Sequence, residues 1–288
     1  MSESAGPRGT VHCADGVEVA RGLADESVDL VYLDPPFNTG KRQERERTRA
    51  KRVEDGEGDR IGFGGRRYET VRLGSRSFDD VFDDYLGFLE PFLVESRRVL
   101  KTSGSLYLHL DYREAHYAKV LLDQIFGREC FVNEIIWAYD YGGRPKKRWP
   151  AKHDTILFYA KDPDRNLFNV DEVERIPYMA PGLVGKEKAA RGKLPTDTWW
   201  HTIVSPTGKE KLGYPTQKPL GVLKRIVAAS SPPGGLVVDL VAGSGTAGAA
   251  ALELGRRFVL ADRSEEAFAV MRRRFDGEAG VEFRGLEA

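Results

Sequence analysis

The sequence Val28-Asp29-Leu30-Val31-Tyr32-Leu33-Asp34-Pro35-Pro36-Phe37 joins an apolar run to an acid, two prolines and an aromatic ring. The apolar run predicts a buried strand of a parallel sheet. Asp34 would then lie at the carboxyl edge of that sheet, where open α/β folds bind ligands. Pro35 and Pro36 fix φ and lack an N–H, so the turn is stiff and its carbonyl groups stay available as acceptors. Together with the ring of Phe37 they suit a planar group that bears an NH2. An isolated Asp-Pro-Pro favours a plain turn, so the rest of the chain decides between the two.

The composition is that of an ordinary α/β protein. The chain has 288 residues, which is enough for one large domain or for one domain with a sizeable insertion. Its formal net charge is +0, so any contact with nucleic acid must come from local basic patches. Cys13 and Cys130 are isolated and the 5 His are scattered, which predicts neither a disulfide framework nor a metal site. There is no signal peptide and no apolar run of the roughly 18 residues that a membrane span needs, so we expect a cytoplasmic protein.

Predicted strands and helices alternate along most of the chain. A strand ending near Asp15, a brief helix over 17–23 and the strand 28–33 form a parallel βαβ unit. Further periodic and apolar segments predict helices at 82–100, 116–126, 220–231 and 246–254, and strands at 105–110, 134–139, 154–159, 236–241 and 257–261. Residues 134–139 and 154–159 are expected to pair as a hairpin. This alternation is typical of a mostly parallel α/β sheet.

Two charged segments interrupt the alternation. Residues 41–76 hold 12 Lys and Arg against 7 Asp and Glu, with little apolar periodicity, which predicts a loop insertion. That loop is either a solvated excursion or a clamp on DNA. The turn of the hairpin interleaves Tyr141 and Trp149 with basic residues, which favours nucleic acid over an ordinary solvated turn. The basic residues of this turn are Arg144, Lys146, Lys147, Arg148 and Lys152.

A glycine-rich turn lies late in the chain. Gly243-Ser-Gly245-Thr-Ala-Gly248 follows the predicted strand 236–241, and Asp262 comes 19 positions after Gly243. This is the arrangement of a dinucleotide-binding fingerprint, in which backbone approaches the ligand and an acid takes ribose hydroxyls. It indicates a nucleotide-like ligand more than it indicates NAD, and a plain tight turn is the alternative. No Lys followed by Ser or Thr comes after the last glycine, so the turn is not a phosphate-binding P-loop.

Three motifs in this order resemble the β-group of DNA amino-methyltransferases. The motifs are Asp34-Pro-Pro-Phe37, Tyr214-Pro-Thr-Gln-Lys-Pro219 and Asp239-Leu-Val-Ala-Gly-Ser-Gly245. The resemblance covers nearly the whole chain and implies a circularly permuted class I, Rossmann-like methyltransferase fold. That fold is α/β, with a mostly parallel seven-stranded sheet and an edge β-hairpin. It implies a single methyltransferase domain over 1–288, with 41–76 as a charged insertion and 140–215 as a target-recognition region. The strands before Asp34 and Gly243 would be neighbours.

The resemblance also implies a reaction and its residues. Methyl transfer from S-adenosylmethionine to the N6 amine of adenine in duplex DNA would use Asp34 and the Pro35 carbonyl as acceptors of the two amine N–H groups. Pro36 and Phe37 complete the catalytic motif, and Phe37 would stack on the flipped base. The implied cofactor contacts are Asp15, Thr216, Lys218, Asp239, Gly243, Gly245, Thr246 and Asp262. The implied DNA contacts are the five basic residues of the hairpin turn, with no metal and no membrane involved.

Departures from the family pattern leave alternatives open. Phe37 and Val241 stand where the family often has Tyr and Phe, while Asp34 in place of Ser favours N6-adenine over N4-cytosine. An NAD-dependent oxidoreductase would explain residues 236–262 but not the Asp34 motif. A non-catalytic DNA-binding module would explain the basic turn alone. A C5-cytosine methyltransferase is excluded, because neither Cys follows a Pro. A homodimer and a cognate restriction enzyme stay open as partners.

Overall fold

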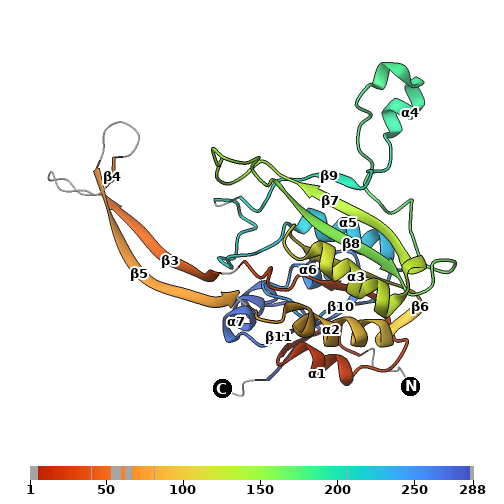
Figure 1. The fold of residues 1–288 in the computed structure, drawn as a ribbon, viewed down its shortest axis with the longest axis horizontal. Helices are drawn as coiled ribbons and strands as arrows, with labels where there is room; N and C mark the ends of the chain where they lie inside the picture. Colours follow the sequence, from red (N-terminus) through yellow and green to blue (C-terminus); the bar gives the residue numbers. More distant parts are fainter. Residues whose placement is uncertain are drawn as a thin grey trace. The chain divides into compact units, whose positions relative to one another are not determined.

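The computed structural model describes residues 6–39, 41–52, 60–61, 67–80, 82–205 and 207–285 (Figure 1). The chain divides into two compact units, one made of Met1–Pro35 with Asp84–Ala288 and the other of Pro36–Asp83. Whether residues 1–288 act as one domain stays a prediction. Among the described residues, no helix is both long and apolar enough to cross a membrane.

The larger unit is built on a nine-stranded sheet, and the prediction of a mostly parallel α/β sheet is confirmed. In the described part of this sheet, β8 alone runs against its neighbours. Across the sheet the strands are β12 (Val281–Arg284), β1 (Gly9–Cys13), β11 (Arg257–Asp262), β10 (Leu236–Asp239), β2 (Val28–Leu33), β6 (Leu100–Leu110), β8 (His153–Ala160), β7 (Phe131–Ala138) and β9 (Thr198–Trp200).

Two short strands make the sheet wider than the seven strands expected. β12 pairs beside β1, and β9 pairs outside the predicted hairpin of β7 and β8, so that hairpin lies next to the edge instead of forming it. The reason is that a bare edge of β7 would expose backbone N–H and C=O groups. β9 covers that edge, with Trp199 buried and Trp200 exposed.

Helices cover the sheet in two groups (Figure 1). α2 (Tyr85–Val99) packs between α1 (Gly16–Arg21) and α3 (Ala115–Phe126). Of these helices, α1 lies on β11, α2 on β6 and α3 on β8. α5 (Leu220–Ser230) and α6 (Thr246–Glu253) pack together, against β2 and β10, and α7 (Glu265–Arg274) packs on β1 and β11. The short α4 (Lys186–Arg191) stands in the otherwise irregular segment before β9. Burial on both faces explains why the inner strands are mostly apolar.

The strand β2 is central, as its apolar run predicts. All of its residues are buried, and its one charged member, Asp29, accepts hydrogen bonds from Lys101 Nζ and the Leu236 N–H, each at 2.8 Å. β2 pairs in parallel with β10, with Leu30 opposite Val237. Strands β11 and β1 extend the sheet on one side of this pair and β6 on the other. The two predicted motifs therefore end neighbouring strands at the point where the strand order reverses.

The smaller unit is a three-stranded antiparallel sheet, and the expectation of an irregular loop over 41–76 is wrong there. β5 (Arg67–Asp80) lies between β3 (Lys41–Arg52) and β4 (Arg60–Ile61). Lys41 stands opposite Asp80 at one end of the ladder. These strands could not be predicted from hydrophobic patterning, because an antiparallel ladder is held by backbone hydrogen bonds, which need no apolar periodicity.

Candidate active site

The carboxylate of Asp34 lies directly after β2, with its two oxygens in different environments. Oδ2 accepts a hydrogen bond from Lys218 Nζ at 2.6 Å. Oδ1 is buried and has no hydrogen-bond partner among the described residues. Because a buried acceptor without a donor is costly, this oxygen is suited to an N–H group of a ligand. The smaller unit begins at Pro36, so the roles of Pro36 and Phe37 stay predictions.

The glycine-rich turn joins β10 to α6 as expected. Gly243 and Gly245 adopt φ of 50° and 74°, which other residues reach only with strain. The Gly245 N–H closes the turn on the Ala242 carbonyl at 2.7 Å. A Cβ on Gly248 would come within 2.7 Å of the Leu260 side chain, so only glycine lets α6 pack this closely on β11.

Asp262 ends β11 and braces the glycine-rich turn. Its Oδ2 accepts the Gly243 N–H and its Oδ1 the Ser264 N–H, both at 2.8 Å. Burial raises the pKa of Asp262, while these two hydrogen bonds act in the opposite direction. Each oxygen keeps a further lone pair, so the carboxylate can also accept ribose hydroxyls.

Asp239, at the end of β10, is the most deeply buried acid of the site. Its side chain accepts the Val241 N–H at 3.1 Å, and the residue is 3% exposed. Burial, followed by repulsion from Asp34 and Asp262, raises its pKa well above the usual value, while Lys218 lowers it. A positively charged ligand would relieve this repulsion. S-adenosylmethionine fits this requirement, because its sulfonium and ammonium outweigh its single carboxylate.

The motif at 214–219 is packed onto the glycine-rich turn. The Thr246 hydroxyl donates to the Lys218 carbonyl at 3.2 Å, and Lys218 Nζ donates to the Thr216 carbonyl at 3.4 Å. A Cβ atom on Gly243 would lie only 2.9 Å from the nearest ring carbon of Tyr214, so the ring packs directly over this glycine. The hydroxyl of Thr246 is thus held by protein. The ammonium of Lys218, one of the implied cofactor contacts, is paired with Asp34.

Asp15 is exposed and caps α1, where its Oδ1 accepts the Val17 N–H at 2.9 Å. The neighbouring Ala14 N–H donates to the Asp262 carbonyl at 3.1 Å, which holds this turn beside the end of β11. The predicted cofactor residues therefore gather at the carboxyl ends of β1, β11, β10 and β2. Contacts of these residues with a cofactor stay predictions.

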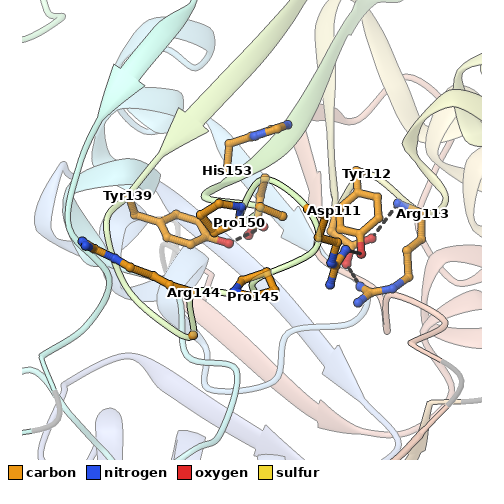
Figure 2. A pocket seen from close by; sticks show the side chains of 12 residues that line it. Asp111, Tyr112, Arg113, Tyr139, Arg144, Pro145, Pro150 and His153 are labelled. Carbon is orange, nitrogen blue, oxygen red and sulfur yellow. Dashed lines mark hydrogen bonds and ion pairs between the residues drawn. The ribbon is translucent and has the colours of Figure 1, made fainter.

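The basic hairpin turn lines an open hollow of about 640 Å³ (Figure 2). Arg144 and Tyr139 lie on one side of it, and Tyr112 and Arg113 lie on the other. Arg148 also lines the hollow, and its guanidinium donates to the Tyr112 hydroxyl at 3.2 Å. Lys152 instead donates to the Gly142 carbonyl at 2.9 Å, inside its own turn. The hollow thus presents guanidinium groups beside aromatic rings at the same edge of the sheet as Asp34.

A buried series of hydrogen-bonded side chains, which the sequence alone does not predict, reaches the wall of this hollow. The Tyr32 hydroxyl and His109 Nδ1 are 2.8 Å apart, and His109 Nε2 lies 3.1 Å from Asp154 Oδ2. The Tyr139 hydroxyl donates to Asp154 Oδ1 at 2.9 Å. The chain thus links β2, two residues before Asp34, to the wall of the hollow. A His inside the apolar run 105–110 was the one available signal.

The fold and this site define an α/β methyltransferase, in which Asp34 and the glycine-rich turn follow neighbouring strands. A family model described as DNA methylase, covering the N6 and N4 enzymes, matches residues 28–273. The chain therefore belongs to the N6/N4 DNA methylase family. It is a DNA methyltransferase, and its cofactor is S-adenosylmethionine.

Two curated relatives and one solved structure illustrate the similarity. The type II methyltransferase M.HpaI of Haemophilus parainfluenzae is 28% identical, over 96% of this chain and 76% of its own length. The DNA adenine methyltransferase YhdJ of Escherichia coli (strain K12) is 29% identical, over 93% of this chain and 82% of its own. The cytosine-N4-specific PvuII DNA methyltransferase shares the fold, with a TM-score of 0.62 at 17% identity, covering 96% of this chain and 92% of that one.

Proposed function

We propose that this protein methylates the N6 amine of adenine in duplex DNA, at a defined sequence. The observation that carries the proposal is the buried Oδ1 of Asp34, which follows the strand beside the glycine-rich turn and has no hydrogen-bond partner in the described part of the chain. The similarity to YhdJ, which is named a DNA adenine methyltransferase, supports adenine as the base.

The exocyclic amine is a poor nucleophile, because its lone pair is delocalised into the ring. Asp34 Oδ1 accepts one of its N–H groups and the Pro35 carbonyl accepts the other, which favours a tetrahedral nitrogen with a localised lone pair. S-adenosylmethionine supplies the methyl group, which it carries on a sulfonium. As the N–C bond forms, the C–S bond breaks and its electron pair stays on sulfur. The Asp34 carboxylate stabilises the positive charge that develops on nitrogen, and the methylated amine then loses its surplus proton to solvent water.

The target base must leave the duplex to reach Asp34, since its amine is stacked and paired inside the helix. Arg144 and Arg148 line the hollow beside the site, and their guanidinium groups can hold the phosphate backbone while the base is extruded.

N4-cytosine is the second candidate, because its exocyclic amine presents the same two N–H groups. PvuII DNA methyltransferase, which shares the fold, is named as specific for that position. Asp34 in place of Ser tilts the choice towards adenine.

Product analysis separates these candidates. Purified protein is incubated with unmethylated genomic DNA and S-adenosylmethionine that carries a labelled methyl group, and the DNA is digested to nucleosides for mass spectrometry. We expect label in N6-methyldeoxyadenosine alone. Label in N4-methyldeoxycytidine would assign the second candidate, and unlabelled DNA would refute both.

A further inference from the structure

Lys218 forms a buried ion pair with the acid that the proposed reaction uses. The two side chains are 10% and 15% exposed, and Lys218 Nζ lies 2.6 Å from Asp34 Oδ2. We propose that Lys218 is a positioning residue, which fixes the Asp34 carboxylate so that Oδ1 faces the target amine. This inference rests on the proposed function and assigns Lys218 to the carboxylate, not to the cofactor.

The two carboxylate oxygens of Asp34 have different roles. Oδ2 is held by the ammonium, while Oδ1 is buried without a partner among the described residues. An unrestrained carboxylate would rotate about its Cβ–Cγ bond and exchange these oxygens. A short, charge-assisted hydrogen bond at Oδ2 opposes that rotation and leaves Oδ1 in one place. Preorganisation of this kind is what a group must have to act where charge develops.

Lys218 is itself held on three sides. Its carbonyl accepts the Thr246 hydroxyl at 3.2 Å, and its ammonium also donates to the Thr216 carbonyl at 3.4 Å. The adjacent Gln217 is buried and bridges the Leu212 N–H and the Glu210 carbonyl, at 2.9 and 2.7 Å. The backbone from which the Lys218 side chain extends is therefore held in place. Through Thr246, the first residue of α6, Lys218 connects Asp34 to the glycine-rich turn.

The charges of the site argue against a contact between Lys218 and the cofactor's carboxylate. Asp34 already takes the ammonium at 2.6 Å, and moving it away would leave Asp34 buried without a counter-charge. The same ammonium also acts on Asp239, since it adds to the hydrogen bond from the Val241 N–H in opposing the rise in the pKa of that carboxyl group. The Lys218 ammonium thus neutralises carboxylate charge within the site.

The test compares Lys218→Met, Lys218→Gln and Lys218→Arg with wild type. Calorimetry measures S-adenosylmethionine affinity, and single-turnover methylation is measured with saturating cofactor and duplex DNA. We expect Lys218→Met to slow methyl transfer by about 10²-fold, the usual effect of losing one preorganising group, while cofactor affinity changes less than about 3-fold. Lys218→Arg, which keeps the charge and a donor, should recover part of the rate, and Lys218→Gln should lie between Arg and Met.

Lys224→Met is the matched control. Lys224 lies on the neighbouring α5 and pairs with Glu253 on the surface, with both side chains partly exposed. It should keep both the rate and the affinity of wild type. In an Asp34→Asn background, Lys218→Met should add little further loss, because the two residues act as one unit.

A loss of cofactor affinity of about 10-fold or more in Lys218→Met, with a normal rate at saturation, would overturn the inference and place Lys218 on the cofactor. A normal rate in all three variants would also overturn it. If Lys218→Met does not fold by circular dichroism, the Gln and Arg variants decide. Failure of the proposed function is a separate result, since wild type itself would then leave DNA unmethylated.

Discussion

At the scale of single residues, the carboxyl group of Asp239 makes cofactor binding sensitive to pH. Its pKa is raised by burial and by Asp34 and Asp262, so the free protein holds a proton there at a higher pH than an ordinary Asp does. A cationic ligand favours the ionised form. Binding should therefore release protons, and affinity should fall as the pH is lowered through the raised pKa. Calorimetry in two buffers of different ionisation enthalpy measures the protons released; proton uptake, or tighter binding in acid, would contradict this.

The same shift has a consequence for stability. A folded-state pKa above the unfolded one means that Asp239 stabilises the fold fully only below about pH 3.9, and that this contribution is lost as the pH rises through the raised pKa. Asp239→Asn should therefore raise the melting temperature of the free protein at neutral pH, while it weakens S-adenosylmethionine binding. A lower melting temperature at neutral pH would show that the carboxylate is not strained in the free protein.

Lys218 shows what a sequence can and cannot give about single residues. Asp34 and Asp262 are predictable because each ends an apolar strand, and strand ends meet at one edge of a parallel sheet. The pairing of Lys218 with Asp34 is not predictable, because these residues are 184 positions apart. They meet through the packing of α5, which Lys218 precedes, on β2, which Asp34 follows. The chain of Tyr32, His109 and Asp154 escapes prediction for the same reason.

At the scale of elements, the basic turn between β7 and β8 is expected to hold DNA by its phosphates. Arg148→Ala should weaken binding equally on all sequences and reduce the slope of log K against log salt by roughly one unit, since one phosphate contact is lost. Binding is measured by fluorescence anisotropy over a range of salt. Arg165→Ala is the control, because this exposed Arg follows the far end of β8.

An altered preference among DNA sequences, with an unchanged salt slope, would mean that Arg148 reads bases. Loss of binding in Arg165→Ala as well would mean that the basic turn is not a specific contact surface.

The strands differ in how far the sequence predicts them. β2 and β10 are central, so burial on both faces makes them apolar and recognisable. β9 and β12 are three and four residues long and are defined by the edges that they cover. β3 and β5 have a polar sequence, and their pairing comes from backbone contacts that hydrophobic patterning does not report.

In the molecule as a whole, Asp34 and the glycine-rich turn are far apart in sequence and adjacent in space. Asp34 and Gly243 follow neighbouring strands. The predicted cofactor contacts run from Asp15 to Asp262, so a bound cofactor ties the first and last parts of the chain together. S-adenosylmethionine at about 100 times its Kd should stabilise the fold by about 2.7 kcal/mol, which raises the melting temperature by roughly 5 °C or more. NAD should give no shift; stabilisation by NAD alone would favour an oxidoreductase.

Asp34 is proposed to supply the catalytic carboxylate, and the Asp34→Asn variant tests this role. The amide keeps the shape and one acceptor but cannot balance a cationic nitrogen. Single-turnover transfer of labelled methyl to duplex DNA is measured at saturating cofactor, with S-adenosylmethionine affinity determined on the same protein. We predict a rate lower by on the order of 10²–10³-fold with cofactor affinity nearly unchanged. Methylation at the wild-type rate by Asp34→Asn would contradict the claim and make this stretch a structural turn.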